Sequence, residues 1–200
     1  MSQLTLTADT LTTVPSGTFE YDGTASYVTT TSSQRGVIAS DQFILQQGAY
    51  TLTSQTAAQK LFNPTTNGTV TLTAGTYAFD CAFSLSSMSA SSGSFGFALG
   101  GGATFTQYWW ADAQKGTATV ATATATQSTY NVAANTTLAT ASVNTVGYAK
   151  INGVIVVTVG GTLIPQVSLG VAAAAVVGIG SYFRIRPLGS SSVTNIGNWC

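Results

Sequence analysis

The chain of 200 residues carries only 6% charged residues and no histidine, whereas an average soluble domain is about 25% charged. The missing histidine excludes a Ser-His-Asp relay and an imidazole-ligated metal site. The formal net charge is zero and the six bases are scattered, so there is no basic stripe for nucleic acid. We therefore expect a protein that is not an enzyme, that holds no cofactor or metal, and that works inside an assembly.

Residues 1–31 form the first segment, which is rich in threonine and is interrupted by a Pro-Ser-Gly sequence at residues 15–17. Its β-forming runs are suited to pairing with the exposed edge of a partner sheet. We expect an N-terminal arm, which either anchors the protein to a larger assembly or adds edge strands to its own domain. The anchoring candidates are Leu4, Leu6, Tyr27 and Val28.

The start of the chain lacks the cationic and apolar regions of a secretory signal. The most apolar stretches, residues 154–157 and 169–180, fall short of the ~20 residues that a membrane-spanning helix needs. These two features predict a protein that is made in the cytosol, stays soluble and does not insert into a membrane.

From residue 32 to residue 200 the sequence favours one continuous domain, in which apolar and polar residues alternate. This period of two predicts half-buried β-strands, and the intervening glycine turns are spaced as in an all-β sandwich or barrel. Only residues 55–61 favour a short helix, while Asn152-Gly153 is compatible with a turn or a bulge. The predicted strands include residues 69–73, 77–85, 94–99, 104–110, 148–159 and 182–186.

The two cysteines are far apart in the sequence. Cys81 shares a strand face with Phe79 and Phe83, which predicts a buried free thiol that acts as a small apolar residue. Cys200 is the last residue. Two cysteines make no disulfide framework, and a bridge between them is left open.

Tyr108, Trp109 and Trp110 form an aromatic group within one predicted strand. Adjacent strand residues point to opposite faces, so one of the two tryptophans is a candidate for a position outside the core. Three interpretations stay open: core packing, a subunit interface, or a ligand groove such as a stacking platform for sugar. Phe95 and Phe97 are further interface candidates.

Other chemistries find little support in the residues. Glu20 and Asp22 lie two residues apart, but nothing else favours the carboxylate pair of a glycosidase. The glycines at residues 100–102 precede alanine and lack the Gly-Lys-Ser/Thr signature of a phosphate loop. The alternating threonines of residues 117–126 change strand face midway, so they form no single flat ice-binding array.

Four segments, in their order and spacing from residue 35 onward, resemble structural proteins of tailed bacteriophages. In those proteins such segments belong to a trimeric jelly roll similar to the complement and tumour-necrosis-factor type. The resemblance implies an antiparallel jelly-roll sandwich over residues 32–200, a homotrimer, and a virion component without a cofactor. The segments are residues 68–77 (GTVTLTAGTY), 160–166 (GGTLIPQ), 180–185 (GSYFRI) and 196–199 (IGNW).

The same resemblance bears on the role within the virion. Only residues 1–31 precede the domain, and no collagen-like or heptad shaft is present, which favours a capsid decoration or head-fibre protein over a long fibre. Its partners are then further copies of itself and other virion proteins, and it is made in the host cytoplasm. The alternative is a receptor-binding module of a tail fibre or tail tip, which recognises host-surface glycans.

Overall fold

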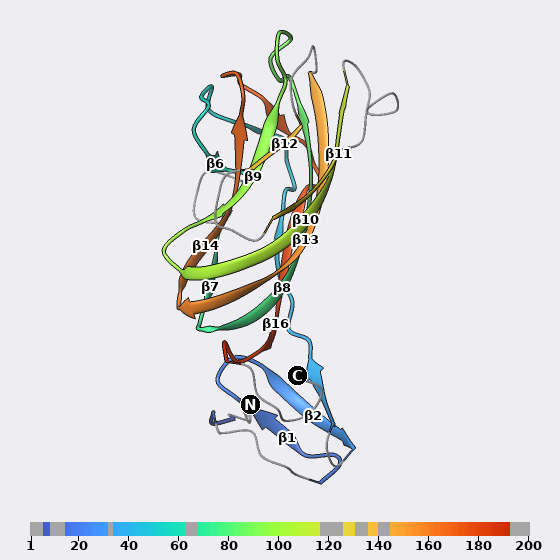
Figure 1. The fold of residues 1–200 in the computed structure, drawn as a ribbon, viewed down its shortest axis with the longest axis vertical. Helices are drawn as coiled ribbons and strands as arrows, with labels where there is room; N and C mark the ends of the chain where they lie inside the picture. The colour runs from blue at the N-terminus through green and yellow to red at the C-terminus, as the bar shows by residue number, and fades with distance from the viewer. Residues whose placement is uncertain are drawn as a thin grey trace.

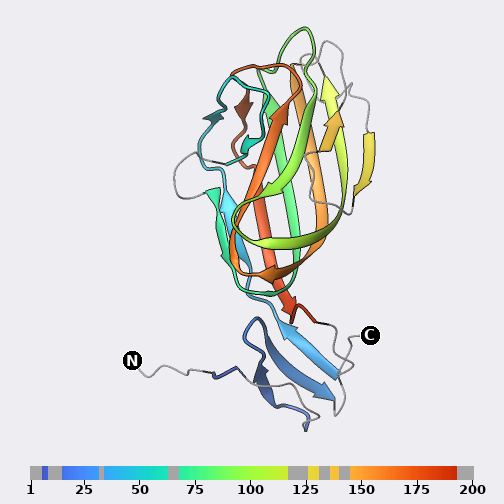
Figure 2. The same cartoon turned by 60° about the vertical axis from the view of Figure 1, so that its left-hand side comes forward.

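The structure, a computed structural model, describes residues 6–8, 15–31, 34–62, 68–116, 126–130, 136–139 and 145–192. Within these residues the fold is all-β and contains no α-helix. The strands pair antiparallel throughout, and two sheets form a sandwich with a small third sheet at one end (Figure 1 and Figure 2). The antiparallel sandwich predicted from the alternation is confirmed.

The small sheet consists of β1 (Phe19–Tyr21), β2 (Ser26–Thr31) and β3 (Gln34–Ile38), with β2 in the centre. Residues 19–31 of the N-terminal segment therefore contain two regular strands, and β3 carries this sheet past residue 31. In Figure 1 the small sheet lies below the sandwich, and the chain passes upward from β3 into it.

The large sheet forms one layer of the sandwich, and its longest strands, β10 and β13, descend from the upper end and curve across the lower end (Figure 1). Because β8 is long, it pairs with two successive neighbours, β16 along its first part and β15 at its end. The strands in spatial order are β11 (Thr126–Tyr130), β10 (Thr104–Gly116), β13 (Val146–Val159) and β8 (Gly75–Ser86), followed by β16 (Tyr182–Gly189) with β4 (Gln42–Leu45), and by β15 (Val176–Val177) with β5 (Tyr50–Thr51).

The second layer is a five-stranded sheet, whose members are β12 (Thr136–Ala139), β9 (Phe95–Gly100), β14 (Gly161–Leu169), β6 (Gln59–Lys60) and β7 (Val70–Leu72). The short helix predicted over residues 55–61 is wrong, because β6 lies there and pairs with Gln166 and Val167 of β14. A short helix gains little on its own, and hydrogen bonds to a sheet outweigh so weak a local preference.

Aromatic side chains fill the space between the two layers. The ring of Phe97 on β9 meets the indole of Trp109 on β10 edge to face, with centroids 5.5 Å apart. Phe83 of β8 packs against both Phe95 and Phe97, at 5.9 Å and 6.4 Å. Edge-to-face and stacked pairs of this kind add to the stability that area burial provides. These contacts join the two sheets into one core.

Gly153 provides the space that Trp109 occupies. The two residues are register partners on β13 and β10, and a Cβ atom on Gly153 would lie 2.5 Å from the Cβ of Trp109. The pairing on both sides of β13 continues through this position without a shift, so neither the turn nor the bulge considered for Asn152-Gly153 is present. The glycine instead permits a close approach of neighbouring groups.

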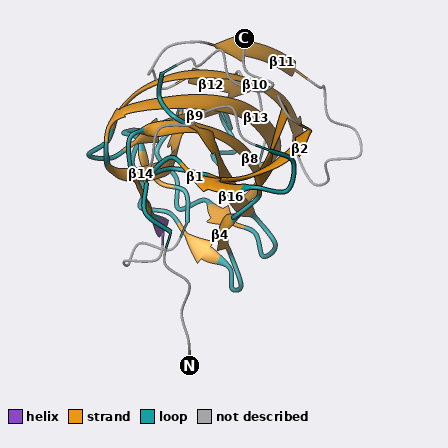
Figure 3. Ribbon diagram, turned by 90° about the horizontal axis from the view of Figure 1, so that it is seen from below, coloured by secondary structure: helices purple, strands orange, loops and turns teal. Residues whose placement is uncertain are grey.

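The small sheet joins the sandwich through hydrogen bonds at one pole. The Thr24 hydroxyl donates to the Ala74 carbonyl at 2.7 Å, and the Tyr27 hydroxyl lies 3.3 Å from the Leu188 carbonyl, which accepts from it. Seen from this pole, β1 and β2 lie across the end of the sandwich near β16 (Figure 3). The junction thus holds the small sheet at this end of the sandwich.

Candidate functional site

The structure separates the five predicted interface or ligand residues into two groups. Phe95, Phe97 and Trp109 are at most 1% exposed and belong to the core of a single chain. Tyr108 and Trp110, by contrast, are 53% and 49% exposed on the outer face of β10. Of the aromatic candidates, therefore, only these two are placed to meet a partner or a ligand.

The anchoring candidates are distributed over the N-terminal segment. Leu4 lies outside the described residues, and Leu6 is exposed. Tyr27 is buried in the small sheet, and Val28 is half-buried in the same strand. Burial and a hydrogen bond to Asp22 raise the pKa of Tyr27 above its ordinary value, so its hydroxyl stays protonated and able to donate. Tyr27 is therefore a structural residue of the junction and is not itself a surface for binding.

A row of five side chains crosses the outer face of the large sheet, one from each of five adjacent strands. Trp110 is opposite Asn152, Asn152 is opposite Asp80, Asp80 is opposite Arg184, and Arg184 is opposite Phe43. We call these five residues the outer row. It places an exposed aromatic side chain at each end of a polar centre, since Phe43 is 60% and Trp110 is 49% exposed.

The centre of the outer row is a connected hydrogen-bond network. Asp80 accepts from Asn152 Nδ2 at 2.5 Å through one carboxylate oxygen, and from Arg184 Nε at 3.0 Å and Nη2 through the other. These bonds to Asp80 raise the pKa of Arg184, so its guanidinium stays protonated and able to donate. The guanidinium also lies 6.0 Å from the centre of the Phe43 ring, within the range of a cation–π contact.

A shallow hollow of about 240 Å³ lies beside the outer row. Its walls include Tyr148 of β13 and Tyr182 of β16, and its floor includes the small side chains of Ala82 and Ser84 on β8. In the register of the sheet, Ala82 pairs with Tyr182, next to the Asp80–Arg184 pair. The large residues on either side of a strand with small outward side chains therefore create a trough on this face.

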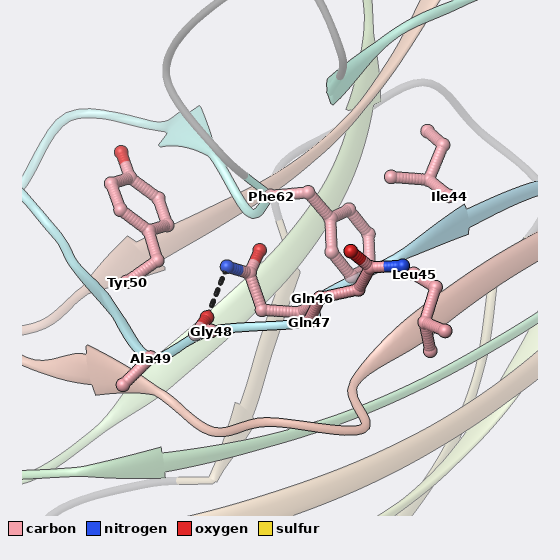
Figure 4. Close-up of a pocket in the computed structure, with 8 residues that line it drawn as sticks. All are labelled: Ile44, Leu45, Gln46, Gln47, Gly48, Ala49, Tyr50 and Phe62. Carbon is pink, nitrogen blue, oxygen red and sulfur yellow. Dashed lines mark hydrogen bonds between the residues drawn. The ribbon is translucent and has the colours of Figure 1, made fainter.

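A second hollow, of about 320 Å³, lies at the loop that follows β4 (Figure 4). The segment from Ile44 to Ala49 forms much of its lining, together with Tyr50 and Phe62. The Gln46 side-chain amide donates to the Gly48 carbonyl, so it holds the loop in place. The lining residues offer no carboxylate, amine or thiol, and their one ionisable group is the Tyr50 phenol, whose pKa is raised by burial.

Two acids of the small sheet, Glu20 and Asp22, and the thiol of Cys81 have structural surroundings. Glu20 forms an ion pair with Arg35, whose side chain is only 3% exposed, while Asp22 accepts backbone hydrogen bonds from Thr24 and Ala25 in a turn. Burial raises the pKa of Cys81 well above its ordinary value, so its thiol is unreactive as a nucleophile. No three His, Cys, Asp or Glu side chains gather as a metal site within the described ranges.

The outer row was not found from the sequence. Alternation predicts that Asp80, Asn152 and Arg184 each point outward from its strand, but it does not give the register that brings them together.

Cys200 and the threonines of residues 117–125 lie outside the described residues. Within the described part of the chain, no helix has the length and apolarity required to cross a bilayer. The chain matches no protein-family model, no curated protein and no solved structure.

Proposed function

We propose that the protein is a non-enzymatic structural component of a bacteriophage virion, a capsid decoration or head-fibre protein. It binds the particle surface through its small sheet and projects the sandwich outward. The phage assignment rests on the segments that resemble structural proteins of tailed phages. The observation that carries the proposed mode of attachment is the separate sheet at one pole of the sandwich, with apolar side chains exposed on both of its outer strands.

The exposed apolar side chains of the small sheet support its role as the anchor. Phe19 on β1 is 63% exposed, and Val37 and Ile38 on β3 are 36% and 39% exposed. Both strands are edges of the sheet, because β2 lies between them. An edge with unpaired backbone groups and apolar side chains is suited to strand addition by a partner sheet. The partner is then an exposed sheet edge of a virion protein.

The ion pair inside the small sheet supports a preformed anchor. Arg35 Nε donates to Glu20 Oε2 at 2.6 Å and Nη2 donates to Oε1 at 3.0 Å, so β1 and β3 are tied together through a bidentate contact. A surface that is ordered before it binds loses less conformational entropy on binding than a disordered arm does. Affinity for the particle is correspondingly higher for the same contacts.

A homotrimer is part of the proposal. Low net charge and exposed apolar side chains favour association, and a closed three-fold ring covers them without open-ended polymerisation. Three anchors on one trimer also bind together, which raises the affinity for the particle by ~10²-fold or more over a single anchor.

The test combines location and attachment. Gold-labelled antibody against the protein is expected to decorate the capsids of intact phage particles in electron micrographs. The variant Phe19→Ser/Val37→Ser is expected to remain trimeric by native mass spectrometry and to lose most of its co-sedimentation with particles. The matched control Val159→Ser, an exposed position at the end of β13, is expected to co-sediment as the wild type does. Unlabelled particles, or undiminished binding by the double variant, would contradict the proposal.

A further inference from the structure

We propose that the outer row is a binding site for an extended, uncharged oligosaccharide. This activity is separate from attachment to the particle, which we assign to the small sheet at the pole of the sandwich. The site is formed by Trp110, Asn152, Asp80, Arg184 and Phe43, and its groups suit hydroxyl-rich ligands for three physical reasons.

The first reason is the geometry of the row. Its members come from β10, β13, β8, β16 and β4, which are consecutive neighbours in the sheet. Neighbouring strands lie ~4.8 Å apart, so the row spans ~19 Å from Trp110 to Phe43. A single sugar ring is shorter than this span, whereas a short linear oligosaccharide fills it. The ligand therefore lies across the strands, with one end at each aromatic ring.

The second reason is the chemistry of the two ends and the centre. An exposed indole or phenyl ring offers an apolar face to the C–H groups of a sugar ring. Between them, the hydrogen bonds described above use one N–H of Asn152 and two of the five N–H groups of Arg184. The remaining guanidinium N–H groups are donors for sugar hydroxyls, and the Asn152 amide offers one more N–H donor and a carbonyl oxygen that accepts. Their mutual bonds through Asp80 hold them in position before a ligand arrives, which lowers the entropic cost of binding.

The third reason is the balance of charge on this face. Arg184 pairs with Asp80, its Nη1 also lies 3.9 Å from an Asp41 carboxylate oxygen, and the neighbouring row places Lys150 opposite Asp112. A face with paired charges has no net attraction for a polyanion such as nucleic acid or a sulfated glycan. Paired charges do, however, retain strong hydrogen-bonding capacity. The complementary ligand is thus polar and uncharged.

The same charges argue for a sugar over a second copy of the chain at this position. Asp80 and Arg184 have side chains 27% and 36% exposed, and they lie in the middle of the row. A protein interface centred on them would remove water from both ions, and charged residues are depleted from interface cores for that reason. An oligosaccharide replaces the lost water with hydroxyl groups and leaves the site partly hydrated. The outer row is therefore better matched to a sugar.

The experiment begins with an array of neutral linear oligosaccharides, from disaccharide to hexasaccharide, beside sialylated and sulfated glycans. We expect saturable binding to neutral chains that strengthens with length up to about the ~19 Å span. Isothermal titration with the best neutral tetrasaccharide then compares variants. Trp110→Ala and Phe43→Ala are each expected to weaken binding about tenfold, since each removes one aromatic platform. Val159→Ala, an exposed apolar position of β13 outside the row, is expected to bind as the wild type does.

A disaccharide spans too little of the row to reach both aromatic ends. In one of the two aromatic variants, the affinity for the disaccharide is therefore expected to fall much less than the affinity for the tetrasaccharide. Circular dichroism and thermal unfolding confirm that these surface variants keep the fold. Four outcomes would overturn the proposal: no saturable binding to a neutral oligosaccharide, binding of acidic glycans alone, wild-type affinity in both aromatic variants, or a change of oligomeric mass in Trp110→Ala. The last outcome would assign the face to a subunit interface.

Discussion

The indole N–H of Trp109 donates a 2.9 Å hydrogen bond to the side-chain oxygen of Gln107, two residues earlier on the same face of β10. Both side chains are buried, at 1% and 0% exposure. A strand thus brings its own acceptor into the core together with its tryptophan, because residues i and i+2 share a face. The bond allows the largest side chain of the core to be buried without an unsatisfied donor.

Replacing Gln107 with leucine tests this relationship. Gln107→Leu keeps the apolar contacts but removes an acceptor of the buried indole, and we expect a loss of about 1–3 kcal/mol in the free energy of unfolding. Urea unfolding followed by tryptophan fluorescence measures it. Thr106→Ala, an exposed neighbour on the opposite face, serves as the control and is expected to change stability by less than about 0.5 kcal/mol. If both variants lost the same free energy of unfolding, Gln107 would not be an important acceptor for the buried indole.

The contact between Gly153 and Trp109 gives a second prediction. In Gly153→Ala the new Cβ would lie 2.5 Å from the Trp109 Cβ and 2.6 Å from the Tyr108 carbonyl oxygen, so backbone atoms must move. We expect a destabilisation of about 1–3 kcal/mol from overpacking. Gly48→Ala is the matched control, since nothing lies within 4 Å of its added Cβ. If differential scanning calorimetry gives the two variants the same melting temperature, β13 does not approach β10 as closely as described.

The ion pair of the small sheet gives a third prediction. Glu20→Gln leaves the Arg35 guanidinium, 3% exposed, without its carboxylate, and breaking a buried pair in this way costs about 3 kcal/mol. We expect faster amide hydrogen exchange in β1–β3 and unchanged exchange in β8 and β13. Asp112→Asn, at an exposed acid of β10, is expected to leave both regions unchanged. Increased exchange throughout the sandwich would show that the small sheet is not an independent unit of stability.

Burial of Cys81 predicts a dependence of stability on alkaline pH. Burial raises the pKa of the thiol, so the folded chain keeps its proton at pH values where the unfolded chain ionises. The free energy of unfolding should therefore be constant with respect to this group below about pH 9 and fall above it, by up to about 1.4 kcal/mol per pH unit. Cys81→Ala should delay the decline until about pH 10, where the buried Tyr27 and Tyr77 begin to contribute. Urea titrations at a series of pH values test this, and parallel curves for the two proteins would contradict it.

The strands were predictable because their cause is local. Apolar residues at every second position of residues 77–85 lie on the buried face of β8, and the outward residues Asp80 and Ser84 fall between them. The burial of Cys81 follows from the same alternation. The helix prediction for residues 55–61 was wrong, because β6 within this range pairs with β14 and nothing in the local sequence indicates that pairing.

The candidate site was not predictable to the same degree. The exposure of Trp110 and the burial of Trp109 are consistent with the alternation. The alternation does not say which of the two faces outward, because that depends on which face of the sheet the second layer covers. The outer row required the register of four neighbouring strand pairs. A shift by one residue between β8 and either β13 or β16 would separate Asp80 from Asn152 or from Arg184. Register is a tertiary property, set by contacts between residues far apart in the chain.

The alignment of Trp109 with Gly153 has a consequence for how the sequences of related chains can vary. The positions that fix the register point inward, whereas their immediate neighbours, Trp110 and Asn152, point outward on the same two strands. Substitutions on the outward positions therefore leave the inward packing unchanged, so the surface can diversify while the scaffold stays constant. Two homologous chains would then differ chiefly in the outward residues of β8, β10, β13 and β16, with the inward residues unchanged.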